Sequence, residues 1–165
     1  MKILGIDPGI GRTGYAILEQ AGKDIRMKAC GCITTLPGES ESKRLLEIKN
    51  DLTALIKKWQ PDVACVESLF FAANAKTAMS VGQARGVIMA TLAEAKLRTI
   101  ELTPLQVKIA ATGFGRADKS QVHKMIMAVL KLKKIPKPDD AADACAIAWA
   151  GIGRSAQLKI TGGRN

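Results

Sequence analysis

The alternation of apolar and polar positions in the first third of the chain predicts three strands joined by short turns. Residues 1–7 are mostly apolar up to Asp7, and a proline–glycine turn follows them. Residues 13–18 and 25–33 form two further strand patterns, with a polar turn around Gly22 between them. Strands joined this closely indicate an antiparallel meander.

The rest of the chain alternates between helical spacing and short apolar runs. We expect a helix at 41–59, a strand at 62–68, a helix at 74–97, a strand at 99–103, and short helices near 104–111, 119–132 and 139–151. Strands that alternate with helices after a meander indicate an α/β or α+β domain with a mixed sheet. The last residues show no sustained periodicity, so 153–165 are predicted to form a flexible basic tail.

Length and charge narrow the class of protein. A chain of 165 residues is near the common size of one domain and can bury a core without disulfides. Its 25 lysines and arginines against 15 acidic residues give a formal net charge of +10. This balance favours a polyanionic partner, with nucleic acid first. The alternative is a basic surface that serves only solubility.

We expect a cytoplasmic protein with no membrane association. The N-terminus runs directly into a strand pattern and shows no signal peptide, and no apolar run reaches membrane-spanning length. The four cysteines form no CxxC pair, so we expect reduced thiols and not a structural zinc site.

Four acidic residues lie at unusual positions: two at the ends of apolar strands, where burying a carboxylate is costly, and two on one face of a predicted helix. Asp7 and Glu67 each end an apolar strand, where a buried carboxylate needs a partner. Asp140 and Asp143 are three apart and share one face of a predicted helix, whereas Asp139 points away and is left out. Each has an ordinary alternative: a turn-forming aspartate, an exposed strand end, or acids favoured by the helix dipole.

Taken together, the four acids support a prediction that none of them supports alone. Four carboxylates repel one another unless cations compensate, and hard oxygen ligands select Mg²⁺, or Mn²⁺ as a substitute, over zinc. Two such ions per site can clamp a phosphodiester. A basic protein with this cluster is therefore expected to hydrolyse nucleic acid backbones.

At these residues the sequence resembles the RuvC-type Holliday-junction resolvases. Five segments match in order and spacing: 5–15, 66–70, 82–86, 103–108 and 140–144. The resemblance implies a single RNase H-like domain over 1–152, with a five-stranded mixed sheet flanked by helices. It also implies a homodimer that resolves four-way DNA by paired symmetric nicks, in recombination and repair. Cleavage at short thymine-containing sequences and cooperation with the RuvA–RuvB branch-migration complex are implied as well.

The resemblance also assigns roles to residues. The family's catalytic acids map onto Asp7, Glu67, Asp140 and Asp143, its DNA-contacting aromatic maps onto Phe70, and positions near the scissile DNA map onto Lys108 and Lys119. Further candidate phosphate contacts are Arg116, Lys76 and Arg85. The alternative for the lysines is an ordinary solvated side chain, and Phe71 is expected to cap the core.

A stripe of small residues suggests the dimer interface. Gly82 and Gly86 stand four apart in a predicted helix, where each glycine costs about 1 kcal/mol relative to alanine. With Ala78 they form a smooth surface for a second helix. The alternative is tight packing on the chain's own sheet.

One departure from the family concerns histidine. Relatives often carry a histidine shortly after the last acid, and here that stretch has none. The single histidine, His123, belongs to a different predicted helix. We therefore predict a site made of carboxylates alone.

Three other functions remain open at this point. Another RNase H-like nuclease, such as one that processes ribosomal RNA, would cut structured RNA but not branched DNA. A sugar-kinase or actin-like ATPase also opens with a strand, an aspartate and a glycine-rich turn, but it needs two such lobes. A non-catalytic DNA-binding module would explain the charge but not the four acids.

Overall fold

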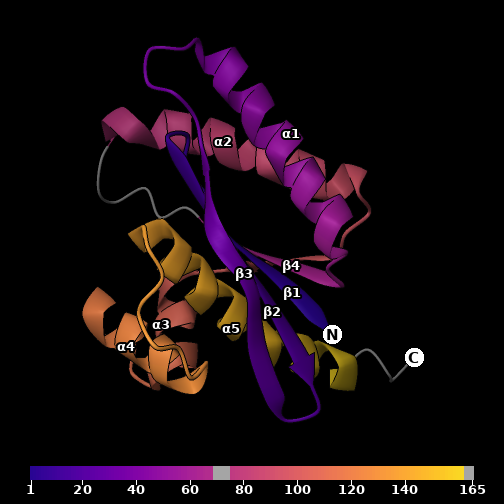
Figure 1. Ribbon diagram of the computed structural model, residues 1–165, viewed down its shortest axis with the longest axis vertical. Helices are drawn as coiled ribbons and strands as arrows, with labels where there is room; N and C mark the ends of the chain where they lie inside the picture. Colours follow the sequence, from indigo (N-terminus) through magenta and orange to yellow (C-terminus); the bar gives the residue numbers. More distant parts are fainter. Residues whose placement is uncertain (69–74, 162–165) are drawn as a thin grey trace.

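The computed structural model describes residues 1–68 and 75–161, and its elements follow the predicted order (Figure 1). The elements are β1 (Lys2–Asp7), β2 (Arg12–Ala21), β3 (Asp24–Thr34), α1 (Glu41–Trp59), β4 (Val63–Glu67), α2 (Ala75–Glu94), β5 (Thr99–Leu102), α3 (Pro104–Thr112), α4 (Lys119–Val129) and α5 (Asp139–Thr161). None of the described helices is long and apolar enough to cross a membrane.

The strands form one mixed sheet with the order β3-β2-β1-β4-β5. β1 pairs antiparallel with β2, and β2 pairs antiparallel with β3, which confirms the predicted meander. β4 pairs parallel with β1 and with β5. Helix α1 before β4 and helix α2 before β5 carry the chain back so that each strand starts at the same end of the sheet as β1. The predicted five-stranded mixed sheet is confirmed.

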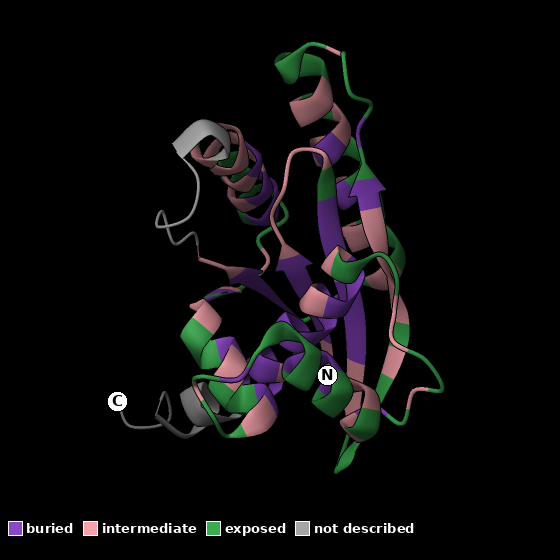
Figure 2. Cartoon of the chain, turned by 90° about the vertical axis from the view of Figure 1, so that its left-hand side faces the viewer, coloured by how far each residue is buried: buried purple, intermediate pink, exposed green. Residues whose placement is uncertain are grey.

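Helices cover both faces of the sheet, and each face has its own core (Figures 1 and 2). On one face, Leu4 and Ile6 of β1 pack with Ile48 of α1 and Ile88 of α2. On the other face, apolar side chains of the sheet pack with α3, α4 and α5. The alternation of β1 thus directs its odd-numbered residues, Asp7 among them, toward the α5 face.

Glycines in the sheet let α5 lie directly against it. A Cβ on Gly5 would overlap the backbone of Ala144 and Ala148, and a Cβ on Gly14 would overlap the Asp140 carbonyl. The first turns of α5 therefore lie over the point where β1 and β2 pair.

The C-terminal prediction needs correction. The helix was expected to end near residue 151 and to give way to a tail at 153–165, but α5 continues to Thr161. Within this helix, Gly151 has no side chain, which makes room for the Cys65 thiol beneath it. Ser155 is buried, and its hydroxyl donates to the Ile152 carbonyl at 2.9 Å. Residues 162–165 lie outside the described part of the chain.

Candidate active site

Asp7 and Glu67 end neighbouring parallel strands at the same edge of the sheet. The register pairs Gly5 with Cys65 and Ile6 with Val66, so the next residues are adjacent. Ile6 and Val66 both pack in the α1–α2 core. Because side chains alternate along a strand, the two acids face α5.

Helix α5 brings the other two acids to the same place. Gly14 is the partner of Asp7 across the β1–β2 ladder, and the backbone of Asp140 lies against Gly14. Asp143 follows one turn later and borders the same cavity as Glu67. The glycine under the helix thus decides how closely the acids of α5 approach those of the sheet.

The pKa values show that the four carboxylates interact. Burial raises the pKa of Asp7 from 3.8 to about 8, and the charges of Glu67, Asp143 and Asp140 add to the effect, while Lys119 opposes it. Burial and the charge of Asp143 raise the pKa of Glu67 to about 6. The structure therefore brings together the four acids predicted from the sequence, in an environment that disfavours their negative charge.

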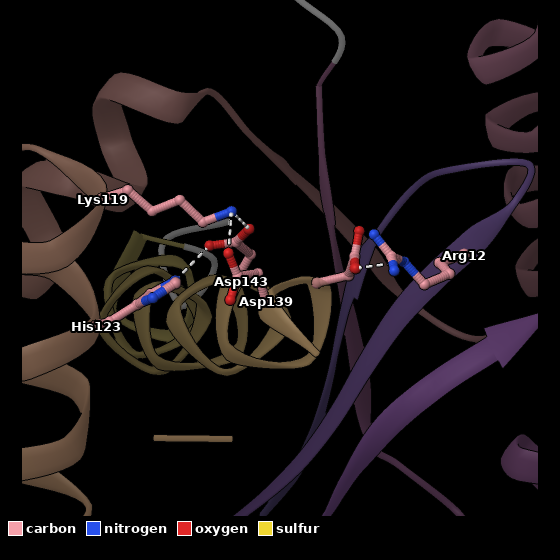
Figure 3. Close-up of polar contacts among 6 residues, drawn as sticks. Arg12, Lys119, His123, Asp139 and Asp143 are labelled. Atoms are coloured by element: carbon pink, nitrogen blue, oxygen red, sulfur yellow. Dashed lines mark hydrogen bonds and ion pairs between the residues drawn. The ribbon is translucent and has the colours of Figure 1, made fainter. Parts of the chain in front are cut away.

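Cationic and polar side chains from other elements hold the two acids of α5 (Figure 3). Asp143 is contacted by Lys119 at 2.7 Å and by the ring of His123 at 2.6 Å, both from α4. Arg12 of β2 lies 2.9 Å from Asp140. Burial lowers the pKa of the Lys119 ammonium, but its contact with Asp143 and the nearby acids outweigh burial and raise it.

Two of these contacts were missed from the sequence. The expectation of a site made of carboxylates alone stays a prediction, but it did not foresee that His123 contacts one of these acids, Asp143, directly. The available signal was spacing: Lys119 and His123 are four apart and share one face of α4. Arg12 is the first residue of β2, just after the glycine-rich turn, and nothing in its local sequence indicates its partner Asp140. Asp139, set aside in the prediction, is 70% exposed and lies 3.8 Å from Lys119.

A cavity of about 210 Å³ opens beside the acids, between the end of β4 and the three helices of this face. Glu67, Lys108, Lys119 and Asp143 line it, so both predicted lysines lie within one cavity with two of the acids. Lys119 stands at the start of α4, where Asp118 and Gln121 form the capping box that fixes the helix end.

The other predicted DNA contacts are less direct. Arg116 is exposed on the loop between α3 and α4. Arg85 of α2 forms an ion pair with Glu101 of β5, and this pair already neutralises the charge of Arg85. Phe70 and Phe71 lie outside the described residues, as does the side chain of Lys76.

At least one residue of the small-residue stripe on α2, Gly86, points away from the chain's own sheet. Ala84 and Ile88 form the buried face of the helix, whereas Gly86 is exposed and a Cβ there would meet nothing within 4 Å. Ala78 and Gly82 are partly exposed. Tight packing of Gly86 on the sheet is therefore wrong, and the dimer interface stays a prediction.

The donor set fits a hard divalent cation. Among residues 1–68 and 75–161, no three histidine, cysteine or acidic side chains are arranged around one ion position. Mg²⁺ does not require this, since it is usually held by one or two carboxylates with water and substrate phosphate. Asp140 Oδ2 is buried and accepts no hydrogen bond from the described residues, although Arg12 Nε lies 2.9 Å away in an ion pair. An oxygen of this kind, beside acids with raised pKa values, is suited to a cation.

Known proteins match this sequence and fold. The family model described as "Crossover junction endodeoxyribonuclease RuvC" matches residues 3–150. A relative with that description from Prochlorococcus marinus (strain NATL1A) is 51% identical over 153 residues, which cover 92% of this chain and 98% of the relative. The structure described as "Thermus thermophilus RuvC structure" superposes with a TM-score of 0.88 at 31% identity, covering 95% of this chain and 96% of that one. "T. thermophilus RuvC in complex with Holliday junction substrate" superposes with a TM-score of 0.89 at the same identity and coverage. The predicted RNase H-like fold is confirmed.

Proposed function

The chain belongs to the RuvC family of crossover junction endodeoxyribonucleases, and on this premise we propose that Asp7, Glu67, Asp140 and Asp143 carry out its cleavage of four-way DNA. The observation that carries this proposal is the environment of Asp7. Burial and three neighbouring acids raise its pKa to about 8. Such a cluster is costly unless a cation compensates it, and a nuclease of this family has a use for that cation.

The cation that suits these oxygens is Mg²⁺, with Mn²⁺ as a substitute and two ions per site as the full complement. Asp7, Glu67, Asp140 and Asp143 would hold it. When bound, it stabilises charge on the scissile phosphate and lowers the pKa of a water molecule that attacks the phosphorus. Proton release from Asp7 accompanies cation binding, because ligand oxygens must be ionised.

Two lysine side chains of the chain itself add positive charge to the site. Lys119 stays protonated, since its pKa is raised, and can donate to a phosphate oxygen as well as to Asp143. Lys108 lies in the same cavity and adds a second positive charge beside Glu67. Both charges favour the binding of a phosphate and stabilise the charge that develops on it during cleavage.

A homodimer is the form that can resolve a junction. Resolution requires a nick in each of two related strands, which a two-fold pair of sites provides. Gly86 is exposed on α2, and Ala78 and Gly82 beside it are partly exposed, which supports this arrangement. We also propose that the enzyme acts in the cytoplasm on junctions handled by the RuvA–RuvB complex.

The test is cleavage of a mobile synthetic four-way junction with Mg²⁺, with both nicks mapped and a structured RNA assayed beside it. We expect symmetric nicks in the DNA. Asp7→Asn should keep junction binding and lose cleavage, whereas Asp51→Asn, an exposed acid on α1, should cut like the unmodified protein. Cleavage of the RNA alone, or Mg²⁺-dependent cleavage by Asp7→Asn, would refute the proposal.

A further inference from the structure

His123 contacts the active-site carboxylate Asp143 from a helix that carries none of the four acids. Its Nε2 lies 2.6 Å from Asp143 Oδ1, across the contact between α4 and α5 (Figure 3). A carboxylate paired with a lysine is an acceptor, and in that arrangement the imidazole Nε2–H is the donor of this hydrogen bond. A short bond of this kind to a charged group restricts how the carboxylate rotates.

The two oxygens of Asp143 have partners of different character. Lys119, one turn before His123 on α4, contacts Oδ2 at 2.7 Å. The Lys119 side chain is 55% exposed, whereas the His123 side chain is only 8% exposed. A long exposed lysine can leave for solvent or for a phosphate, but a buried imidazole has little freedom to move.

The surroundings of His123 keep it in place. Its neighbour Val122 and Ile126, one turn on, are buried in the core beneath α5. The Asp118–Gln121 capping box fixes the start of the same helix. Burial of the His123 side chain and of its neighbours on α4 therefore limits how far the ring can move.

We propose that His123 is a positioning residue, which holds Asp143 through Oδ1 and thereby keeps Oδ2 available to Lys119 or to a divalent cation. The inference rests on the proposed function, since it assigns a divalent cation to Asp143. Groups that orient a metal-ligating carboxylate typically change metal affinity or activity by roughly 10- to 100-fold when removed. A site whose ligand is held in advance loses less freedom when a cation binds.

The decisive variants differ in whether the side chain can donate a hydrogen bond to Asp143. His123→Leu removes the donor and places an apolar side chain in this buried position. His123→Gln keeps an amide N–H at a similar reach, whereas His123→Asn presents the same amide one methylene short. Ile126→Val is the matched control, because it perturbs the same buried face of α4 without touching Asp143.

Two readouts separate positioning from mere stability. Direct Mn²⁺ binding to the full-length protein without DNA is followed by electron paramagnetic resonance, and the Mg²⁺ dependence of junction cleavage is measured beside it. We expect His123→Leu and His123→Asn to weaken Mn²⁺ binding and raise the half-saturating Mg²⁺ concentration by roughly 10- to 100-fold. His123→Gln should recover most of the loss, and junction affinity in Ca²⁺ should change less than about threefold in every variant.

A double-mutant cycle with Asp143→Asn shows whether His123 acts through this carboxylate. In that background, His123→Leu should cause no further loss of Mn²⁺ binding. The inference is overturned if His123→Leu and His123→Asn match Ile126→Val in both readouts, or if their effect persists with Asp143→Asn. If the unmodified protein cuts no junction yet His123→Leu still weakens Mn²⁺ binding, the proposed function fails and the positioning role stands.

Discussion

Gly14 and Asp140 meet through their backbones, because α5 lies where a side chain on Gly14 would be. Gly14→Ala should therefore push the first turn of α5 away from β2. We expect the free energy of unfolding to fall by about 1 to 3 kcal/mol, the usual cost of overpacking a close contact. Cleavage should fall further than junction binding, since Asp140 moves with the helix. Urea denaturation, a cleavage assay and a binding titration in Ca²⁺ measure the three effects.

Gly153→Ala is the control for Gly14→Ala. Gly153 lies on α5, the helix that packs against Gly14, but a Cβ there would meet nothing within 4 Å. This change should raise the free energy of unfolding by up to about 1 kcal/mol, through helix propensity alone. Equal effects of the two alanines would show that the Gly14 contact is not what positions α5.

The raised pKa of Asp7 predicts a stability penalty. The folded protein retains a proton up to about pH 8 that the unfolded chain releases above 3.8, so the free energy of unfolding falls as the pH rises through this window. Asp7→Asn removes the titration and should be more stable than the unmodified protein at pH 8 by about 1 to 3 kcal/mol. Thermal or urea unfolding with a chelator present measures this difference.

The same unfolding series with Asp51→Asn should follow the unmodified protein at every pH, because that acid is exposed on the opposite face. If Asp7→Asn shows the same decline between pH 4 and pH 8 as the unmodified protein, the stability penalty does not come from Asp7.

Most of the fold could be predicted from the sequence because its elements have strong patterns. The strand ending at Asp7 and the helix over 41–59 combine clear periodicity with a turn or proline at the boundary. The end of α5 could not be predicted, since the residues after 152 show no sustained helical periodicity. The contact that favours glycine at position 151 is with the Cys65 thiol, on a strand far away in the sequence.

The site likewise has a part that could be predicted from the sequence and a part that could not. Asp7 and Glu67 end strands and Asp140 and Asp143 share a helix face, so local pattern and family resemblance sufficed to select them. The partner of Arg12 and the role of His123 depend on how α5 is placed against β2 and α4. Single-sequence spacing shows that Lys119 and His123 share a face, but not that Asp143 lies opposite them.

Protons and cations should compete for the acids of the site. Burial raises the pKa of Asp7 to about 8 and that of Glu67 to about 6, and both must be ionised to act as ligands. The half-saturating Mg²⁺ concentration for junction cleavage should therefore fall as the pH rises from 6 to 8. Removal of divalent ions by a chelator should abolish cleavage at every pH. Cleavage rates over a grid of pH and Mg²⁺ concentration test this, and a half-saturating concentration that is constant over the range would contradict it.

The uncovered face of α2 predicts how the dimer can be broken. Gly86→Leu places a large side chain in open space on the single chain, so the fold should be unaffected. The same side chain would keep a second helix from approaching the stripe. We expect a shift from dimer to monomer in sedimentation velocity, and loss of paired nicks on a junction. Ala54→Leu, at an exposed position on α1, is the matched control and should stay dimeric. A Gly86→Leu protein that remains dimeric and nicks both strands would place the interface elsewhere.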